Sequence, residues 1–64
     1  MADDTTSLAI STFKVGNALK NLEEHHLAEK FYKQCLDLRP DYAAAHNEYG
    51  EVLAKQGKYE DALK

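Results

Sequence analysis

The sequence has one cysteine and one proline, and it lacks long runs of like charge and long apolar runs. Cys35 alone cannot form an intramolecular disulfide, and a free thiol is typical of a reducing compartment, so we expect a cytoplasmic protein. The N-terminal residues MADDTTSLAI begin with acidic side chains and have neither a basic segment nor a long apolar stretch. They therefore fit neither a signal peptide nor a membrane span, and they show no organelle address.

Charge and size limit the functions that remain. The 64 residues carry 11 acidic and 8 basic side chains, for a net charge of -3. Both signs are interspersed without a basic patch, so we expect neither nucleic acid nor an anionic membrane as a partner. The hydrophobic share of 44% is ordinary for a folded domain. A domain of this size buries only about 60% of its unfolded surface, so its stability is limited.

Apolar side chains recur at spacings of three or four residues, which predicts helices rather than strands. We expect a polar leader at residues 1–7, with Ser7 as the N-cap of a first helix over residues 8–22. A second helix is expected over residues 24–38. The apolar residues predicted to face a neighbouring helix are Ala9, Val15, Leu19 and Leu22 in the first helix and Leu27, Phe31, Cys35 and Leu38 in the second.

Pro40 predicts a break after the second helix, because proline cannot continue a helix interior. Asp41 can then cap a third helix over residues 42–56, which Gly57 is predicted to end as a C-cap glycine. Residues 58–64 would begin a fourth helix that is too short to be stable alone. The predicted fold class is therefore all-α, with antiparallel helices.

Two glycines interrupt these helices at a fixed interval. A glycine inside a helix costs about 1 kcal/mol relative to alanine, and Gly16 and Gly50 are 34 residues apart (50 − 16). A shift by 34 residues also pairs Ser7 with Asp41, Ala9 with Ala43, Leu19 with Leu53, Ala28 with Ala62 and Lys30 with Lys64. This period indicates a repeated helix pair whose helices approach closely at small residues. We expect Gly16 to lie against Ala28, and Gly50 against Ala62.

The pattern resembles the tetratricopeptide repeat, a helix pair of about 34 residues. The matching residues are Gly16, Leu19, Ala28, Tyr32 and Pro40 in the first unit and Tyr49, Gly50, Leu53, Gly57, Tyr59 and Ala62 in the second. The resemblance implies a truncated right-handed superhelix (α-solenoid) of antiparallel helix pairs. Its first repeat would span residues 8–40, and an incomplete second repeat would span residues 41–64.

The first unit departs from the family pattern near its loop. Glu23 stands where the loop usually has glycine, and His25 replaces an aromatic residue. Thr12 and His46 occupy the fourth positions of the two units, which are usually bulky. These departures suit a divergent terminal repeat and put the helix ends in doubt.

No catalytic motif is discernible, so we expect no enzyme, no cofactor and no metal site. His25 and His26 are adjacent and point about 100° apart on a helix, so they cannot chelate one ion as a pair; we expect them to be exposed between helices. His46 is expected to pack at a helix contact, and Cys35 to be buried rather than reactive. The tyrosines expected to pack on helix contact stripes rather than to stack on bases are Tyr32, Tyr42, Tyr49 and Tyr59.

In tetratricopeptide arrays the first helix of each pair lines a concave groove. The resemblance places Phe13, Lys14, Asn17, Lys20 and Asn21 of the first repeat and Asn47, Glu48, Glu51 and Lys55 of the second in that groove. A plain solvated helix face is the alternative. Asn17 matches one position of the dicarboxylate clamp of chaperone-binding members, but Phe13 and Glu48 replace its lysine and second asparagine. We therefore do not expect a receptor for chaperone tails.

Two functions remain open. The chain is either a scaffold that binds a peptide or helix of a partner protein on the concave face, or a structural unit. As a structural unit it would be a fragment of a longer array or would self-associate into an oligomer. The groove changes from basic at Lys14 and Lys20 to acidic at Glu48 and Glu51, which predicts a ligand of matching polarity. The third-helix face around Tyr49, Val52 and Leu53 is predicted to be partly uncovered.

Overall fold

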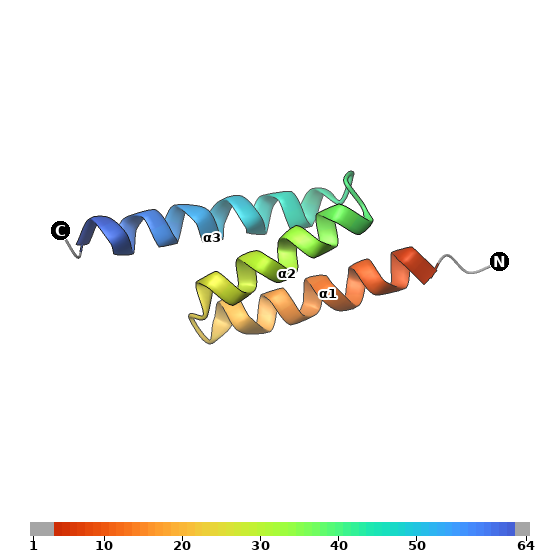
Figure 1. Cartoon of the computed structure of the whole chain (residues 1–64), viewed down its shortest axis with the longest axis horizontal. Coiled ribbons are helices and arrows are strands. Elements are labelled where there is room, and N and C mark those ends of the chain that lie inside the picture. Colours follow the sequence, from red (N-terminus) through yellow and green to blue (C-terminus); the bar gives the residue numbers. More distant parts are fainter. Residues whose placement is uncertain (1–3, 63–64) are drawn as a thin grey trace.

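The chain folds into antiparallel α-helices, as the apolar spacing predicts. The computed structural model describes residues 4–62, except for the side chain of Tyr59, and within that range it contains three helices and no strand. These are α1 (Asp4–Asn21), α2 (His25–Leu38) and α3 (Ala43–Ala62). Helix α2 lies between α1 and α3 in an elongated molecule of 51 × 20 × 13 Å (Figure 1). Among the described residues, no helix is both long and apolar enough to span a membrane.

The turn between α1 and α2 is held by two crossed backbone hydrogen bonds. The Glu24 N–H donates to Leu19 O at 2.9 Å, and the Glu23 N–H donates to Lys20 O at 3.0 Å. This is the Schellman arrangement, which requires a left-handed residue after the helix. Glu23 takes that conformation, with φ 62°, at the place where the repeat pattern usually has glycine.

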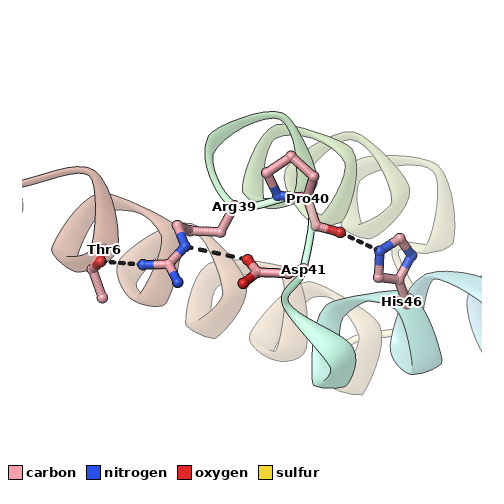
Figure 2. A network of polar contacts seen from close by, with 5 residues as sticks. All are labelled: Thr6, Arg39, Pro40, Asp41 and His46. Atoms are coloured by element: carbon pink, nitrogen blue, oxygen red, sulfur yellow. Dashed lines mark hydrogen bonds and ion pairs between the residues drawn. The ribbon is translucent and has the colours of Figure 1, made fainter.

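The turn between α2 and α3 is held by polar contacts near the turn and by one contact to the start of α1 (Figure 2). Arg39 Nη1 donates to Thr6 Oγ1 of α1 at 2.5 Å, and Arg39 Nε donates to Asp41 Oδ1 at 3.4 Å. His46 Nε2 lies 2.7 Å from Pro40 O. His46 is exposed and bonds to the turn, so the prediction that it packs at a helix contact is wrong.

The core consists of two small clusters joined by Phe13. Both clusters contain fully buried residues from different helices: Ala9, Cys35 and Ala45 in the first, and Ala28, Tyr32 and Val52 in the second. Phe13 packs against both. Cys35 is buried, as predicted, and burial raises the pKa of its thiol. A protonated, buried thiol is a packing group rather than a nucleophile.

Gly16 lies at a close contact between α1 and α2, but its nearest neighbour is not the predicted Ala28. A Cβ on Gly16 would lie 2.7 Å from Tyr32 Cε1 and 2.9 Å from Tyr32 Cδ1. Only a residue without a side chain lets the tyrosine ring approach α1 so closely at this point. Ala28 belongs to the same buried cluster as that ring.

The corresponding predictions for the second repeat are wrong. Helix α3 runs through Gly57 to Ala62 without a break, so residues 58–62 form no separate helix. Gly50 is exposed, and in the described part of the chain a Cβ on it would meet nothing within 4 Å. Ala62 lies on the same helix and is also exposed, so it cannot pack on Gly50. The side chain of Tyr59 lies outside the described residues.

Continuation of α3 has a simple physical reason. The chain turns back at Glu23, and this turn allows α2 to bury Ala28 and Tyr32 against α1. The described side chains after Gly57 are all exposed: Lys58, Glu60, Asp61 and Ala62. A separate helix over residues 58–62 would be too short to be stable, whereas extending α3 adds one backbone hydrogen bond per residue.

Several other sequence predictions also need correction. Helix α1 begins at Asp4, so Ser7 lies inside it rather than at its N-cap. His25 is buried, with 8% of its surface exposed, because it begins α2 on the side that faces the core; it is not an exposed residue between helices. Val52 is fully buried against α2, which leaves Leu53 as the exposed large apolar residue among the described side chains of α3. The residues of the two predicted stripes that stay exposed are Val15, Leu22 and Leu27.

Candidate protein-binding surface

Polar side chains of α1 and α3 meet where the predicted groove residues lie. Lys20 Nζ donates to Glu48 Oε2 in an ion pair that links the two helices, and each side chain keeps 20% of its surface exposed. The two residues are 28 positions apart in the sequence. Two oppositely charged groove residues therefore satisfy each other rather than both facing a ligand.

A buried tyrosine of α2 lies within electrostatic reach of this ion pair. The Tyr32 hydroxyl donates to Asn17 Oδ1 at 2.6 Å, and the Tyr32 side chain is fully buried. Burial, followed by the charges of Glu48 and Glu51, raises the pKa of Tyr32 to about 12. Glu51 thus lies within electrostatic reach of the same phenol. We call Asn17, Lys20, Tyr32, Glu48 and Glu51 the α1–α3 polar cluster.

Phe13 packs against Tyr32 of this cluster. Its ring centroid lies 5.8 Å from that of Tyr32 and 5.1 Å from that of Tyr42, and both ring pairs are tilted. Phe13 is half-buried and packs in both core clusters. Its contacts with both aromatic neighbours make Phe13 a packing residue of the fold. That Phe13 lines a binding groove stays a prediction.

The other predicted groove residues differ in how far they reach solvent. Lys14, Asn21, Asn47 and Glu51 are exposed, whereas Lys55 is half-buried. With Lys20 and Glu48 paired to each other, Lys14 is the exposed cation of α1 in the predicted set and Glu51 the exposed anion of α3. The change from basic to acidic along this face stays a prediction, which now depends on Lys14 and Glu51.

Two polar contacts away from this cluster were not predicted from the sequence. Gln56 Nε2 donates to Glu29 Oε1 at 2.6 Å and so links α3 to α2; Glu29 is half-buried and does not simply point outward. The hydrogen bond from Arg39 lowers the pKa of Asp41, with further contributions from a backbone hydrogen bond and the Arg39 charge. Arg39 and Asp41 carry opposite charges on the two sides of Pro40, which was a weak sequence signal of their contact.

The described residues do not assemble a metal-binding group. Within residues 4–62, no three histidine, cysteine, aspartate or glutamate side chains lie together in a way that could hold an ion. The polar cluster contains two carboxylates, but Lys20 occupies one of them. The arrangement suits hydrogen bonding and ion pairing with another protein segment.

Comparison with known proteins agrees with this architecture. Two models, each described as a tetratricopeptide repeat, match residues 11–42 and residues 31–64. No curated protein and no solved structure gives a match. The fold defines a helical repeat protein built of antiparallel helix pairs. The chain belongs to the tetratricopeptide repeat family, whose members generally act as non-enzymatic modules of protein–protein interaction.

Proposed function

We propose that this chain is a non-enzymatic interaction module that binds an extended peptide or a helix of a partner protein across α1 and α3. The observation that carries the proposal is the convergence of polar groups from two repeats at one place. The Lys20–Glu48 ion pair joins the two helices, and the charge of Glu48 acts on Tyr32, which donates a hydrogen bond to Asn17. A segment lying across this place would contact side chains of both repeats.

The exposed groups determine the chemistry of the ligand. A lysine or arginine side chain of the ligand would pair with Glu51, and an acidic side chain would pair with Lys14. The amide groups of Asn17 and Asn47 can bond the ligand backbone. Because Asn17 Oδ1 already accepts from Tyr32, its NH₂ group is the one that serves a ligand carbonyl.

The affinity should be modest. A stable interface usually buries about 1,200 Å² or more in total, and two helix faces offer little area to an extended peptide. Rim charges of this kind act mainly through the association rate and the salt dependence of binding. We expect binding that weakens markedly as salt is raised.

The test compares Glu51→Lys with Glu60→Lys, a matched change at an exposed acid near the end of the same helix. Peptides selected against the protein from a displayed random library serve as ligands. Glu51→Lys should weaken binding, more at low salt than at high salt, whereas Glu60→Lys should leave it unchanged. Equal effects of the two substitutions, or no effect of either, would exclude the α1–α3 surface as the binding site.

Exposed apolar residues favour a second candidate, a structural unit of a longer array or a self-associating unit. Leu8, Leu22 and Leu53 are 57%, 72% and 42% exposed, and a further repeat unit or a second copy could cover them. Sedimentation equilibrium over a range of concentrations tests self-association. A rise in apparent mass with concentration supports that reading, and a constant monomer mass rejects it. For either candidate, the free thiol of Cys35 favours a cytoplasmic location.

A further inference from the structure

The Lys20–Glu48 ion pair uses one oxygen of the glutamate and leaves the other available. Lys20 Nζ donates to Glu48 Oε2. Glu48 Oε1 makes no hydrogen bond to the described residues, and it is not a buried atom. Each side chain of the pair keeps 20% of its surface exposed. A ligand group can therefore reach Glu48 while Lys20 is still bound to it.

Glu51 adds a second carboxylate at this place. Glu48 and Glu51 are three positions apart on α3, so their side chains are neighbours on the helix surface. After burial, the charges of both glutamates contribute to the raised pKa of Tyr32, which indicates that both lie on the side of α3 that faces this residue. Glu51 and Lys55 form no ion pair with the described residues. Two carboxylates thus share the ammonium group of Lys20.

The two members of the ion pair differ in how easily they can be released. Lys20 lies in the last turn of α1, where the helix dipole favours a positive charge, and its long side chain can carry the ammonium group into water. Release of Glu48 from Lys20 would instead leave two like charges side by side on α3, which is destabilising. A cation of a ligand therefore replaces Lys20 more easily than an anion of a ligand replaces Glu48.

We propose that Lys20 is an exchangeable partner of Glu48, and that the surface selects a ligand with an arginine side chain, which displaces Lys20 and bonds Glu48 and Glu51 together. This inference rests on the function proposed above and names the ligand group that the α1–α3 polar cluster recognises. A guanidinium presents several N–H donors in a planar fork and bonds carboxylates through two nitrogens. A lysine of the ligand has one ammonium group, so it only replaces the contact that Lys20 already makes.

Lys20 is then an internal competitor of the ligand. While its ammonium group stays on Glu48, it occupies a carboxylate that a ligand cation would use. Removing the charge of Lys20 should therefore strengthen the binding of a basic ligand, although it removes a contact between α1 and α3. Loss of a residue that itself contacted the ligand would have the opposite effect.

The experiment titrates two short peptides that differ in one side chain, acetyl-Gly-Arg-Gly-amide and acetyl-Gly-Lys-Gly-amide, into the ¹⁵N-labelled full chain at low salt. The arginine peptide should bind about two- to fivefold more tightly than the lysine peptide, the range of a partly exposed charged contact. As the arginine peptide binds, the Nζ resonance of Lys20 should move to the position of a free lysine. The Nζ resonance of Lys14 should stay where it is.

Lys20→Met and Lys14→Met form a matched pair, because each removes one positive charge from α1. Lys20→Met should bind both peptides about two- to fivefold more tightly than the wild type, whereas Lys14→Met should have a smaller effect. Both variants should keep the helical circular dichroism of the wild type, since neither lysine belongs to the core clusters.

Binding of the arginine peptide with an unchanged Lys20 resonance would overturn the proposal and leave the function proposed above intact, because the peptide would then pair with Glu51 alone. Equal affinities of the two methionine variants, or no binding of either peptide to Lys20→Met, would overturn it as well. The function proposed above fails on a different result, namely library-selected ligands that bind equally well to the wild type and to Glu51→Lys.

Discussion

At the scale of single residues, Glu23 is the described non-glycine residue with a left-handed backbone, at φ 62°. A side chain in this conformation costs roughly 1–2 kcal/mol, whereas glycine adopts it freely. We expect Glu23→Gly to stabilise the fold by about 0.5–1 kcal/mol after the added chain entropy of the unfolded state is subtracted. Urea unfolding measures the change. Glu24→Gly, at φ -85°, is the control and should destabilise.

Gly16 and Gly50 occupy equivalent positions of the two repeats but should respond oppositely to alanine. At Gly16 the new Cβ would lie 2.7 Å from the ring of Tyr32, which Asn17 holds in place. Overpacking there costs about 1–3 kcal/mol, against a gain of about 1 kcal/mol in helix propensity. At Gly50 only the gain applies, because no neighbour lies within 4 Å. Urea unfolding should show a loss for Gly16→Ala and a gain for Gly50→Ala, and losses at both positions would contradict the packing described.

Tyr32 makes stability depend on pH in the alkaline range. Its folded-state pKa, about 12, lies above the ordinary value of 10.0, so the fold favours the neutral phenol. The full contribution is present below pH 10, and it is lost as the pH rises through 10 toward 12. The loss is at most about 3 kcal/mol, at about 1.4 kcal/mol per pKa unit.

The measurement compares urea unfolding of the wild type and of Tyr32→Phe over this pH range. The variant should be less stable at neutral pH, because Asn17 loses its hydrogen-bond partner. It should then lose less stability than the wild type between pH 10 and 12. Parallel declines in the two proteins would show that the phenol of Tyr32 does not titrate with unfolding.

At the scale of helices, periodicity located the three helices but not all of their ends. The apolar spacing placed α2 within one residue of its observed start, and Pro40 separated it from α3. The end of α3 depends on two competing effects, the turn preference of a residue and the burial gained after the turn. The local sequence indicates only the first. Gly57 is the better turn former, yet Glu23 makes the turn, because the helix after Glu23 buries Ala28 and Tyr32 against α1. Burial after the turn outweighs the preference of the turn residue.

Gly57→Ala tests the continuity of α3. Inside a helix, alanine gains about 1 kcal/mol over glycine. In a left-handed turn it would lose a similar amount instead. We therefore expect higher stability in urea unfolding and slightly stronger helical circular dichroism. A loss of stability would mean that residue 57 forms a turn in solution.

At the scale of the whole molecule, Arg39 joins the start of α1 to the turn before α3 (Figure 2). Removing the Arg39 side chain should loosen the contact between the start of α1 and the turn that joins α2 to α3. We expect Arg39→Ala to destabilise by about 1–2 kcal/mol, because its hydrogen bonds to Thr6 and Asp41 are lost. Lys33→Ala, at an exposed position of α2, is the matched control and should change the free energy of unfolding little. Similar small changes in both variants would contradict the linking role of Arg39.

The candidate surface could be predicted only in part, because its contacts depend on how helices that are distant in the sequence pack against each other. The 34-residue period indicated which residues share the first-helix faces, and Lys20, Asn17 and Glu48 do lie together. It could not indicate that Lys20 and Glu48 pair with each other, since that contact depends on the angle between α1 and α3. The bond between Thr6 and Arg39, 33 residues apart, left no periodic signal at all.

The placement of α2 between its neighbours also bears on how fast the chain folds. Helix α1 touches α3 at few points, so nearly all packing joins helices that are consecutive in the sequence. Each contact then requires the closure of a short loop, and helical proteins with such local contacts fold in microseconds to milliseconds. We expect the hairpin of α1 and α2, with Tyr32 against Gly16, to form first. Helix α3 would then add to a surface already formed, and unfolding should begin with its release.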